Sequence, residues 1–311
     1  MFPMEPIKAV CVVGAGFMGW QIGLQCASHG FPVRLYDISV ESLEKAKEAI
    51  QGELEGRVEK GQISADEKEA VLQRVIITGD LEEAAKDVDL VIEAVPERLE
   101  IKREVFGRLD GLCDDHTILA TNSSSIRISK IEGATHRLDR VLNTHFYNFP
   151  WKRPIVELMR GTKTSDETME RVRGFMRAIG VIPLTVLRES TGFIFNRVWR
   201  AIKRETLHLV DDGVASFEDV DRAWMILNDR EIGPFGMMDR VGLDVVRDIE
   251  MVYYEESGDK ADAPPRLLLD KIERGELGVK TGRGFYGYPN PRFQDPDWLR
   301  RKNLRREKPQ P

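Results

Sequence analysis

The first half of the chain alternates short apolar runs, rich in β-branched residues, with longer amphipathic stretches. The apolar runs cover residues 9–13, 33–37, 75–78, 89–95, 117–121, 140–145, 155–159 and 182–187. Such runs, separated by helical patterns, are typical of parallel strands that are covered by helices. The pattern predicts an α/β domain built on a mostly parallel sheet.

Three helix starts are marked in the amphipathic stretches. Ser39 precedes the helical pattern of residues 40–60. Ser64 and Glu67 form the Ser-x-x-Glu pattern of a capping box. Pro96 is expected to open the next helix, because proline lacks only an N–H group that would be unpaired at that position.

The pattern changes in the second half of the chain. Residues 192–256 show no strand alternation and carry amphipathic helical patterns, one of them at 237–256. Residues 277–289 are rich in glycine, which predicts turns and loops. We therefore expect two domains, an α/β domain of residues 1–189 and an all-helical domain of residues 190–311.

A glycine loop follows the first apolar run. The sequence VVGAGFMG places Gly14, Gly16 and Gly19 in the pattern Gly-x-Gly-x-x-Gly, after a strand and before a helix. In dinucleotide-binding proteins the first glycine allows a tight turn, the second a close approach of the pyrophosphate, and the third close packing of helix on strand. The free N–H groups of the helix N-terminus then face the phosphates. We expect this loop, including Phe17 and Met18, to bind the cofactor.

The second apolar run ends in Asp37, eighteen residues after Gly19. An acid at this point accepts hydrogen bonds from the hydroxyls of the adenine ribose. The residues that follow, ISVES, carry no cation for a 2′-phosphate, which favours NAD over NADP. The glycines alone would also fit a tight turn that binds nothing, whereas the strand, helix and acid in register favour a dinucleotide.

Composition narrows the class of protein. The 311 residues are 41% hydrophobic and carry a formal net charge of −6, which allows a sizeable core and disfavours nucleic acid as a partner. No apolar run reaches the roughly 18 residues of a membrane-spanning helix, and the N-terminus lacks the pattern of a signal peptide. The cysteines have no metal-like spacing and indicate reduced thiols in a cytoplasmic protein: Cys11, Cys26 and Cys113. We expect neither a membrane anchor nor a metal.

One histidine and one glutamate form a candidate catalytic pair. His145 ends the sixth apolar run, and Glu157 follows twelve residues later in the next run. Oxidation of an alcohol by NAD removes a hydride from carbon and a proton from oxygen, and histidine is the usual base for that proton. A carboxylate behind the ring fixes its tautomer and stabilises the imidazolium. If their strands are neighbours, His145 and Glu157 form such a pair; otherwise they are a surface histidine and a half-exposed glutamate.

Ordered blocks of the sequence resemble the short-chain L-3-hydroxyacyl-CoA dehydrogenases, including bacterial 3-hydroxybutyryl-CoA dehydrogenases. The blocks are VVGAGFMG, DLVIEAVPERLEIKREVF, ILATNSSSI, THFYN followed by VEL, STGFIFNR, IGPFGMMDRVGLD and LGVKTGRGFYGY, and they extend from about residue 7 to 288. The resemblance implies a Rossmann-type N-terminal domain, a helical C-terminal domain that forms a homodimer, and an active site in the cleft between them.

The resemblance also implies roles for single residues. His145 matches the catalytic base, and Glu157 matches the carboxylate that orients it. Ser124 matches the serine that hydrogen-bonds the substrate near its hydroxyl, and Asn196 matches the asparagine that helps to close the site. The remaining matches bind the substrate or line the nicotinamide half of the cofactor: Asn148 and Lys60 for the substrate, and Glu97, Lys102 and Asn122 for the cofactor.

Taken singly, these residues have simpler interpretations. Ser124 could cap a short helix, and Asn148 could form a turn beside prolines. Asn196 could be an exposed polar residue of a helix. Glu97 and Lys102 could belong to a solvated helix face, which is the usual environment of such charges.

The loop after the histidine departs from the family pattern. In HFYNFPWKRPIVEL, residues 149–154 place Phe149, Trp151, Lys152 and Arg153 where the family has small or apolar residues. A Lys–Arg pair beside a tryptophan could bind a carboxylate or a phosphate through charge-assisted contacts. It could equally belong to an exposed loop.

A second departure concerns coenzyme A. Bacterial members carry two lysines in this region that contact coenzyme A, and Lys60 in the stretch GRVEKGQ matches one of them. Gly56 stands in the place of the other. Arg57 could compensate, although an adjacent residue on a helix points about 100° away.

Three hypotheses follow from the sequence. The first is NAD-dependent oxidation of a short-chain L-3-hydroxyacyl-CoA in fatty acid metabolism. The second is oxidation of a free 3-hydroxy acid, as in gulonate or carnitine dehydrogenases, which the altered loop and Gly56 favour. The third is an NAD-binding protein without turnover, similar to the recruited crystallins, and the intact set of catalytic residues disfavours it.

Overall fold

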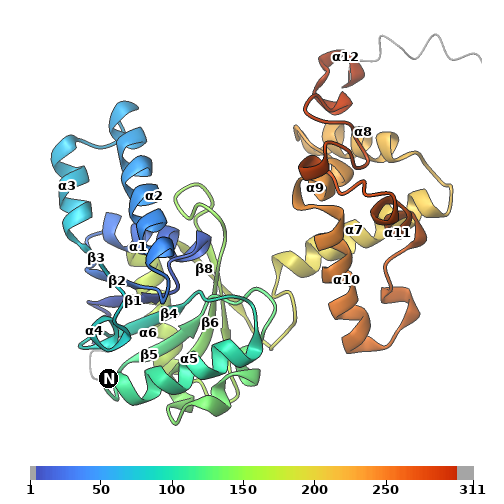
Figure 1. The fold of residues 1–311 in the computed structure, drawn as a ribbon. Coiled ribbons are helices and arrows are strands. Elements are labelled where there is room, and N and C mark those ends of the chain that lie inside the picture. The colour runs from blue at the N-terminus through green and yellow to red at the C-terminus, as the bar shows by residue number, and fades with distance from the viewer. Residues whose placement is uncertain (1–4, 300–311) are drawn as a thin grey trace, which may run out of the picture. The chain divides into compact units, whose positions relative to one another are not determined.

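The computed structural model describes residues 5–299, except for the side chain of Pro296. The chain divides into two compact units between Ile194 and Phe195 (Figure 1). Within the described range, none of the helices combines the length and apolarity that a membrane crossing requires.

The first unit is built on a sheet of eight strands in the order β3-β2-β1-β4-β5-β6-β7-β8 (Figure 1). The strands are β1 (Val10–Val13), β2 (Val33–Tyr36), β3 (Val75–Thr78), β4 (Leu90–Glu93), β5 (Ile118–Thr121), β6 (Val141–Phe146), β7 (Ile155–Arg160) and β8 (Ile182–Val186). All neighbours run parallel except β6 and β7, which are antiparallel. The predicted α/β class is confirmed, because each apolar run of the sequence overlaps one strand.

Helices cover both faces of this sheet. They are α1 (Phe17–Ser28), α2 (Val40–Glu59), α3 (Ala65–Gln73), α4 (Leu81–Ala85), α5 (Leu99–Leu112) and α6 (Asp166–Ala178). Successive residues of a strand point to opposite faces. On β1, Val10 and Val12 accordingly pack in the core cluster that includes residues of α1, α2 and α6, whereas Cys11 and Val13 pack in the cluster that includes residues of α4 and α5.

Two of the predicted helix starts are confirmed by their caps. The Ser39 hydroxyl accepts a hydrogen bond of 3.2 Å from the backbone N–H of Ser42 and begins α2. Ser64 and Glu67 form the complete capping box of α3, with reciprocal hydrogen bonds of 3.1 and 2.7 Å. Local sequence determines these ends, because both partners lie within one helical turn.

The predicted helix start at Pro96 is wrong. Helix α5 begins at Leu99, and residues 96–98 form a turn in which the Arg98 N–H donates to the Pro96 carbonyl over 2.7 Å. The reason lies far away in the sequence. The side chain of Glu97 accepts hydrogen bonds from Ser123 and from the following loop, and this holds residue 97 outside the helix.

The second unit is helical. Its helices are α7 (Phe195–Asp211), α8 (Phe217–Asn228), α9 (Pro234–Val241), α10 (Leu243–Ser257), α11 (Arg266–Glu273) and α12 (Pro296–Leu299). The amphipathic pattern of residues 237–256 is divided between α9 and α10 at Gly242, whose φ of +100° does not fit a continuous helix. The glycine-rich stretch 277–289 forms a loop with isolated β-bridges, as predicted.

Candidate active site

The glycine loop joins β1 to α1, and its three glycines have different surroundings. Gly14 has a φ of +104°, and a Cβ there would lie 2.7 Å from the Ala94 carbonyl oxygen. A Cβ on Gly19 would lie 1.7 Å from the Gly14 carbonyl oxygen, so this position allows α1 to approach the loop. A Cβ on Gly16 would meet no protein atom within 4 Å. This open face, at the uncapped N-terminus of α1, fits the close approach of a pyrophosphate.

Asp37 follows β2 and holds the glycine loop in place. Its carboxylate accepts hydrogen bonds from the Ala15 N–H at 2.7 Å and from the Ser39 N–H at 2.9 Å. Each carboxylate oxygen can accept a further hydrogen bond, so contact with ribose hydroxyls is compatible with this arrangement. Asp37 therefore supports the glycine loop, in addition to the contact with the adenine ribose that the sequence predicts.

The structure brings His145 and Glu157 together. They are direct partners in the antiparallel ladder of β6 and β7, so their side chains lie on the same face of the sheet. The His145 Nδ1 atom lies 2.8 Å from Glu157 Oε2. The histidine is 6% exposed and the glutamate is fully buried. The pair is therefore held in a setting with little solvent, where a charge has a strong effect on its partner.

Tyr147 completes the surroundings of this pair and was not predicted from the sequence. Its hydroxyl donates to Glu157 Oε2 over 2.9 Å, and the Ile194 N–H donates to Oε1 over 2.9 Å. Burial and the nearby Glu157 charge raise the pKa of the Tyr147 phenol, so it stays protonated and donates. The rings of Tyr147 and Phe193 lie 4.8 and 5.0 Å from the His145 ring. The sequence signal for Tyr147 was its two-residue spacing from His145.

A cavity of about 300 Å³ opens at the ends of β4, β5 and β6. Seven residues that the sequence singled out line it: Met18, Glu97, Lys102, Asn122, Ser124, His145 and Asn148. Asn122 also ties two of these strands together, because its side-chain oxygen accepts a hydrogen bond of 2.9 Å from the Phe146 N–H. The carboxyl ends of the strands in an open α/β sheet are the usual place for a ligand.

Lys102 is held in the wall of this cavity by a buried acid. It is 1% exposed, and its ammonium contacts Glu93 Oε1 at 2.8 Å, Glu97 Oε2 at 3.2 Å and the Val95 carbonyl at 3.3 Å. Burial raises the pKa of Glu93, although Lys102 and the Thr121 hydroxyl act in the opposite direction. Sequence reasoning missed Glu93. Its signal was an acid in the interior of the apolar run of residues 89–95, four residues after the Asp89 that begins the run.

Glu97 supports the loop that carries Ser124. Its Oε1 atom accepts hydrogen bonds from the Ser123 hydroxyl at 2.5 Å, the Ser125 hydroxyl at 2.7 Å and the Ser125 N–H at 2.9 Å. Burial raises the pKa of this carboxyl, but the Lys102 charge and the serine hydrogen bonds outweigh it and lower the pKa on balance. Glu97 is therefore an anion that fixes the loop on both sides of the exposed Ser124.

Besides the three glycines of the glycine loop, Asp37 and Glu157, three further predicted residues do not line the cavity. Phe17 is 55% exposed and packs edge to face on Phe149, with ring centroids 5.9 Å apart. Lys60 is the exposed residue that ends α2. Asn196 lies in the first turn of α7, in the second unit, and its role in the site is still a prediction.

Two family models match the chain. The NAD binding domain of 3-hydroxyacyl-CoA dehydrogenase matches residues 9–190, and the C-terminal domain of the same enzyme matches residues 192–288. The chain belongs to the 3-hydroxyacyl-CoA dehydrogenase family. The resemblance found in the sequence is thereby confirmed, and so is NAD as the cofactor of this family member.

Individual members of the family agree over most of the chain. A probable 3-hydroxybutyryl-CoA dehydrogenase of Bacillus subtilis (strain 168) is 37% identical over 282 residues, which are 91% of this chain and 98% of that protein. The crystal structure of (S)-3-hydroxybutyryl-CoA dehydrogenase from Ralstonia eutropha has a TM-score of 0.87 and 33% identity, and covers 91% of this chain and 100% of that one. The 5-formyl-3-hydroxy-2-methylpyridine 4-carboxylate 5-dehydrogenase of Mesorhizobium japonicum is 30% identical and covers 91% of each chain.

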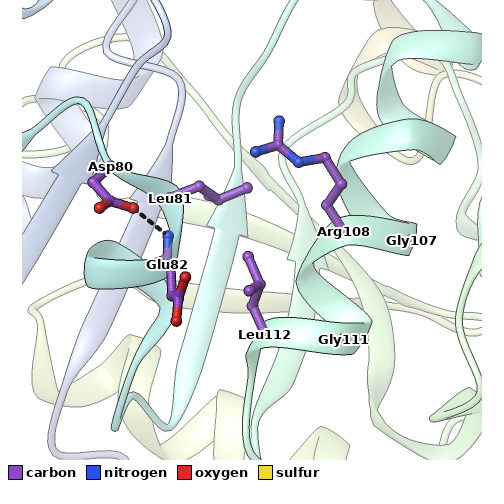
Figure 2. Close-up of a pocket in the computed structure, with 7 residues that line it drawn as sticks. All are labelled: Asp80, Leu81, Glu82, Gly107, Arg108, Gly111 and Leu112. Atoms are coloured by element: carbon purple, nitrogen blue, oxygen red, sulfur yellow. Dashed lines mark hydrogen bonds between the residues drawn. The ribbon is translucent and has the colours of Figure 1, made fainter.

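A second hollow, of about 480 Å³, lies between α4 and α5 (Figure 2). Leu81 and Leu112 point into it, and the Arg108 guanidinium lies on its other side. Its charged side chains are exposed, and Asp80 is engaged in capping α4 through the Glu82 N–H at 2.9 Å. None of the residues that match the family's catalytic or binding positions lines this hollow, so the smaller cavity at His145 is the candidate active site of this dehydrogenase.

Proposed function

We propose that this family member oxidises the hydroxyl of a short-chain L-3-hydroxyacyl-CoA to a ketone, with His145 as the general base and Glu157 as the residue that orients it. Bound NAD supplies the acceptor for the hydride. One observation carries the proposal: His145, in the wall of a cavity that also contains matched cofactor positions, lies 2.8 Å from the fully buried carboxylate of Glu157.

The tautomer of His145 follows from its partner. A carboxylate oxygen only accepts, so Nδ1 carries the proton that it donates to Glu157, and Nε2 has a free lone pair. That lone pair is the base for the proton of the substrate hydroxyl. When the imidazolium forms, the Glu157 charge stabilises it without moving, since Tyr147 and the Ile194 N–H already hold both carboxylate oxygens.

The other cavity residues have supporting roles in the proposal. Ser124, exposed on a loop that Glu97 fixes, hydrogen-bonds the substrate near its reacting hydroxyl. Asn148, at the start of the next loop, contacts the substrate, and Asn196 and Lys60 are assigned to it by the resemblance alone. Lys102 and Asn122 belong to the cofactor side.

The test is turnover by the purified protein. With NAD and 3-hydroxybutyryl-CoA it should form NADH and acetoacetyl-CoA in equal amounts. Absence of NADH with 3-hydroxyacyl-CoA substrates of every chain length would refute the proposed reaction.

A free 3-hydroxy acid is the second candidate substrate. The position of Arg57 supports this candidate, because its Nε is bound to Glu53 at 3.0 Å and its guanidinium is stacked 4.6 Å over the Trp151 ring, which makes it a less accessible cation than the lysine that is missing at Gly56. The Mesorhizobium japonicum relative is named for a substrate that is a carboxylate and not a coenzyme A thioester. Assays of free acids against their thioesters, at equal concentrations, separate the two candidates.

We also propose a homodimer that acts in the cytoplasm in fatty acid metabolism. Val245, Ile249 and Val252 follow one face of α10 at helical spacing and are 41%, 39% and 39% exposed. Such an apolar stripe on a helix surface supports contact with a second copy. Sedimentation of the purified protein would test it, and a monomer at micromolar concentration would contradict it.

A further inference from the structure

The loop of residues 147–154, between β6 and β7, is fastened at its base. The Phe149 N–H donates to the Gln21 side-chain oxygen on α1 over 2.5 Å. The Phe149 carbonyl accepts from the N–H groups of Lys152 at 2.8 Å and Arg153 at 2.9 Å, which closes a tight turn. The lime-green loop in Figure 1 that rises beside α2 is this segment.

Aromatic packing fixes the same loop on two helices. The Phe149 ring packs edge to face on Phe17 at 5.9 Å and on Trp151 at 5.7 Å. Trp151 in turn lies 6.0 Å from Trp20 of α1 and beneath the Arg57 guanidinium of α2, at 4.6 Å. Phe149 has a φ of +57°, a conformation that a bulky residue adopts only where its surroundings enforce it. The loop is therefore pre-organised.

This rigid turn carries more cations than it uses internally. Lys152 and Arg153 are both exposed, and within residues 5–299 neither side chain has a carboxylate partner or another hydrogen-bond acceptor. The Lys152 ammonium lies 5.4 Å over the Phe149 ring. The Trp151 indole N–H and one Arg57 amino nitrogen are buried without an acceptor in the described structure. Arg57, Trp151, Lys152 and Arg153 therefore form a cluster with an excess of hydrogen-bond donors and positive charge.

The cluster borders the candidate active site. Asn148 and Met18 line the cavity of His145, and the residues next to them in sequence, Phe149 and Phe17, are in ring contact. The ammonium of Lys152 lies over that Phe149 ring. The turn that carries Lys152 and Arg153 thus begins at Phe149, the residue that follows the cavity-lining Asn148.

We propose that Lys152 and Arg153 form a subsite for an anionic group of the substrate, at the end away from the reacting hydroxyl. This inference rests on the proposed function for the position of that hydroxyl near His145. A carboxylate and a phosphate present the same oxygen acceptors to a lysine and an arginine. Because the turn is already ordered, binding such a group costs less conformational entropy than ordering a flexible loop would.

The test is equilibrium binding to the full-length protein, measured by calorimetry without NAD so that no turnover occurs. The ligands are 3-hydroxybutyryl-CoA, which carries phosphates, 3-hydroxybutyrate, which carries a carboxylate, and 3-hydroxybutyryl-pantetheine, which carries neither. The variant is Lys152→Gln with Arg153→Gln. The control is Lys47→Gln with Arg108→Gln, which removes the same charge from exposed positions on α2 and α5.

We expect the Lys152/Arg153 variant to bind the anionic ligand roughly tenfold to a hundredfold more weakly and the pantetheine thioester unchanged. Loss confined to the coenzyme A thioester identifies a phosphate as the anion, and loss confined to 3-hydroxybutyrate identifies a carboxylate. Unchanged binding of both anions, no binding of either anion to the wild-type protein, or an equal loss with pantetheine or in the control variant would overturn the subsite. Failure of the proposed oxidation appears separately, as absence of NADH in the turnover assay.

Discussion

Replacing Glu157 with glutamine removes the charge behind His145 while keeping the size of the side chain. The carboxylate is fully buried and accepts from His145 Nδ1, the Tyr147 hydroxyl and the Ile194 N–H. For charges about 4 Å apart, at an effective dielectric constant of about 20, the attraction to an imidazolium is roughly 4 kcal/mol. A remaining hydrogen bond from the amide offsets about 1 kcal/mol of that loss.

The net loss of about 3 kcal/mol in the transition state corresponds to a fall in kcat of roughly a hundredfold. NAD affinity should stay unchanged, because Glu157 is not among the residues that line the cavity. Steady-state NADH formation, with a separate NAD titration, measures both quantities.

A matched control is Tyr147→Phe, which removes one hydrogen bond to Glu157 and keeps the charge. It should lower kcat only about tenfold or less. If the glutamine variant kept wild-type kcat, Glu157 would be a structural residue and the reasoning would be wrong.

Two further predictions concern cofactor binding and stability. Gly16→Ala should fold normally but bind NAD roughly tenfold more weakly, because its methyl group enters the open space that the pyrophosphate would approach. Gly19→Ala should unfold at a clearly lower temperature, because its methyl group would lie 1.7 Å from the Gly14 carbonyl oxygen. Thermal unfolding and NAD titration of both variants check this pair, and equal effects would contradict it. Although burial raises the pKa of Asp110, hydrogen bonds from Arg137 and its neighbours outweigh it and hold the pKa well below its usual range. As pH falls below about 4, the Asp110 carboxyl therefore binds a proton more readily in the unfolded state than in the folded state. The folding stability that the charged Asp110 contributes at neutral pH is lost in this range. Asp110→Asn should cost about 1–3 kcal/mol in urea unfolding at pH 7, with the difference shrinking at pH 3; a pH-independent difference would refute the assigned cause.

Much of the first unit is predictable from sequence because its signals are local. The apolar runs reveal buried strands, and the caps at Ser39 and Ser64 have both partners within a few residues. The glycine loop is equally local, since strand, glycines and helix follow one another. No single residue predicts the antiparallel pairing of β6 and β7 that joins His145 to Glu157. The length of the intervening loop does predict it, because residues 147–154 are too few for a parallel crossover.

The features that sequence reasoning missed depend on distant partners. The Glu97 side chain is hydrogen-bonded to Ser123 on another loop and lies outside α5, so the helix begins at Leu99 and not at Pro96. Glu93 is a buried acid whose partner, Lys102, lies on a helix. Arg57 could not be assigned from α2 alone, because the stack on a tryptophan of the β6–β7 loop decides where its guanidinium lies. No local pattern contains these contacts.

The central claim is that His145 takes the proton of a secondary hydroxyl while bound NAD accepts the hydride. The most direct measurement is the rate of NADH formation in a single turnover, with the wild-type protein and the His145→Ala variant, at saturating NAD and 3-hydroxybutyryl-CoA. The account predicts a rate lowered roughly 10²- to 10⁴-fold in the variant, with NAD affinity unchanged. A variant that forms NADH at the wild-type rate would contradict it.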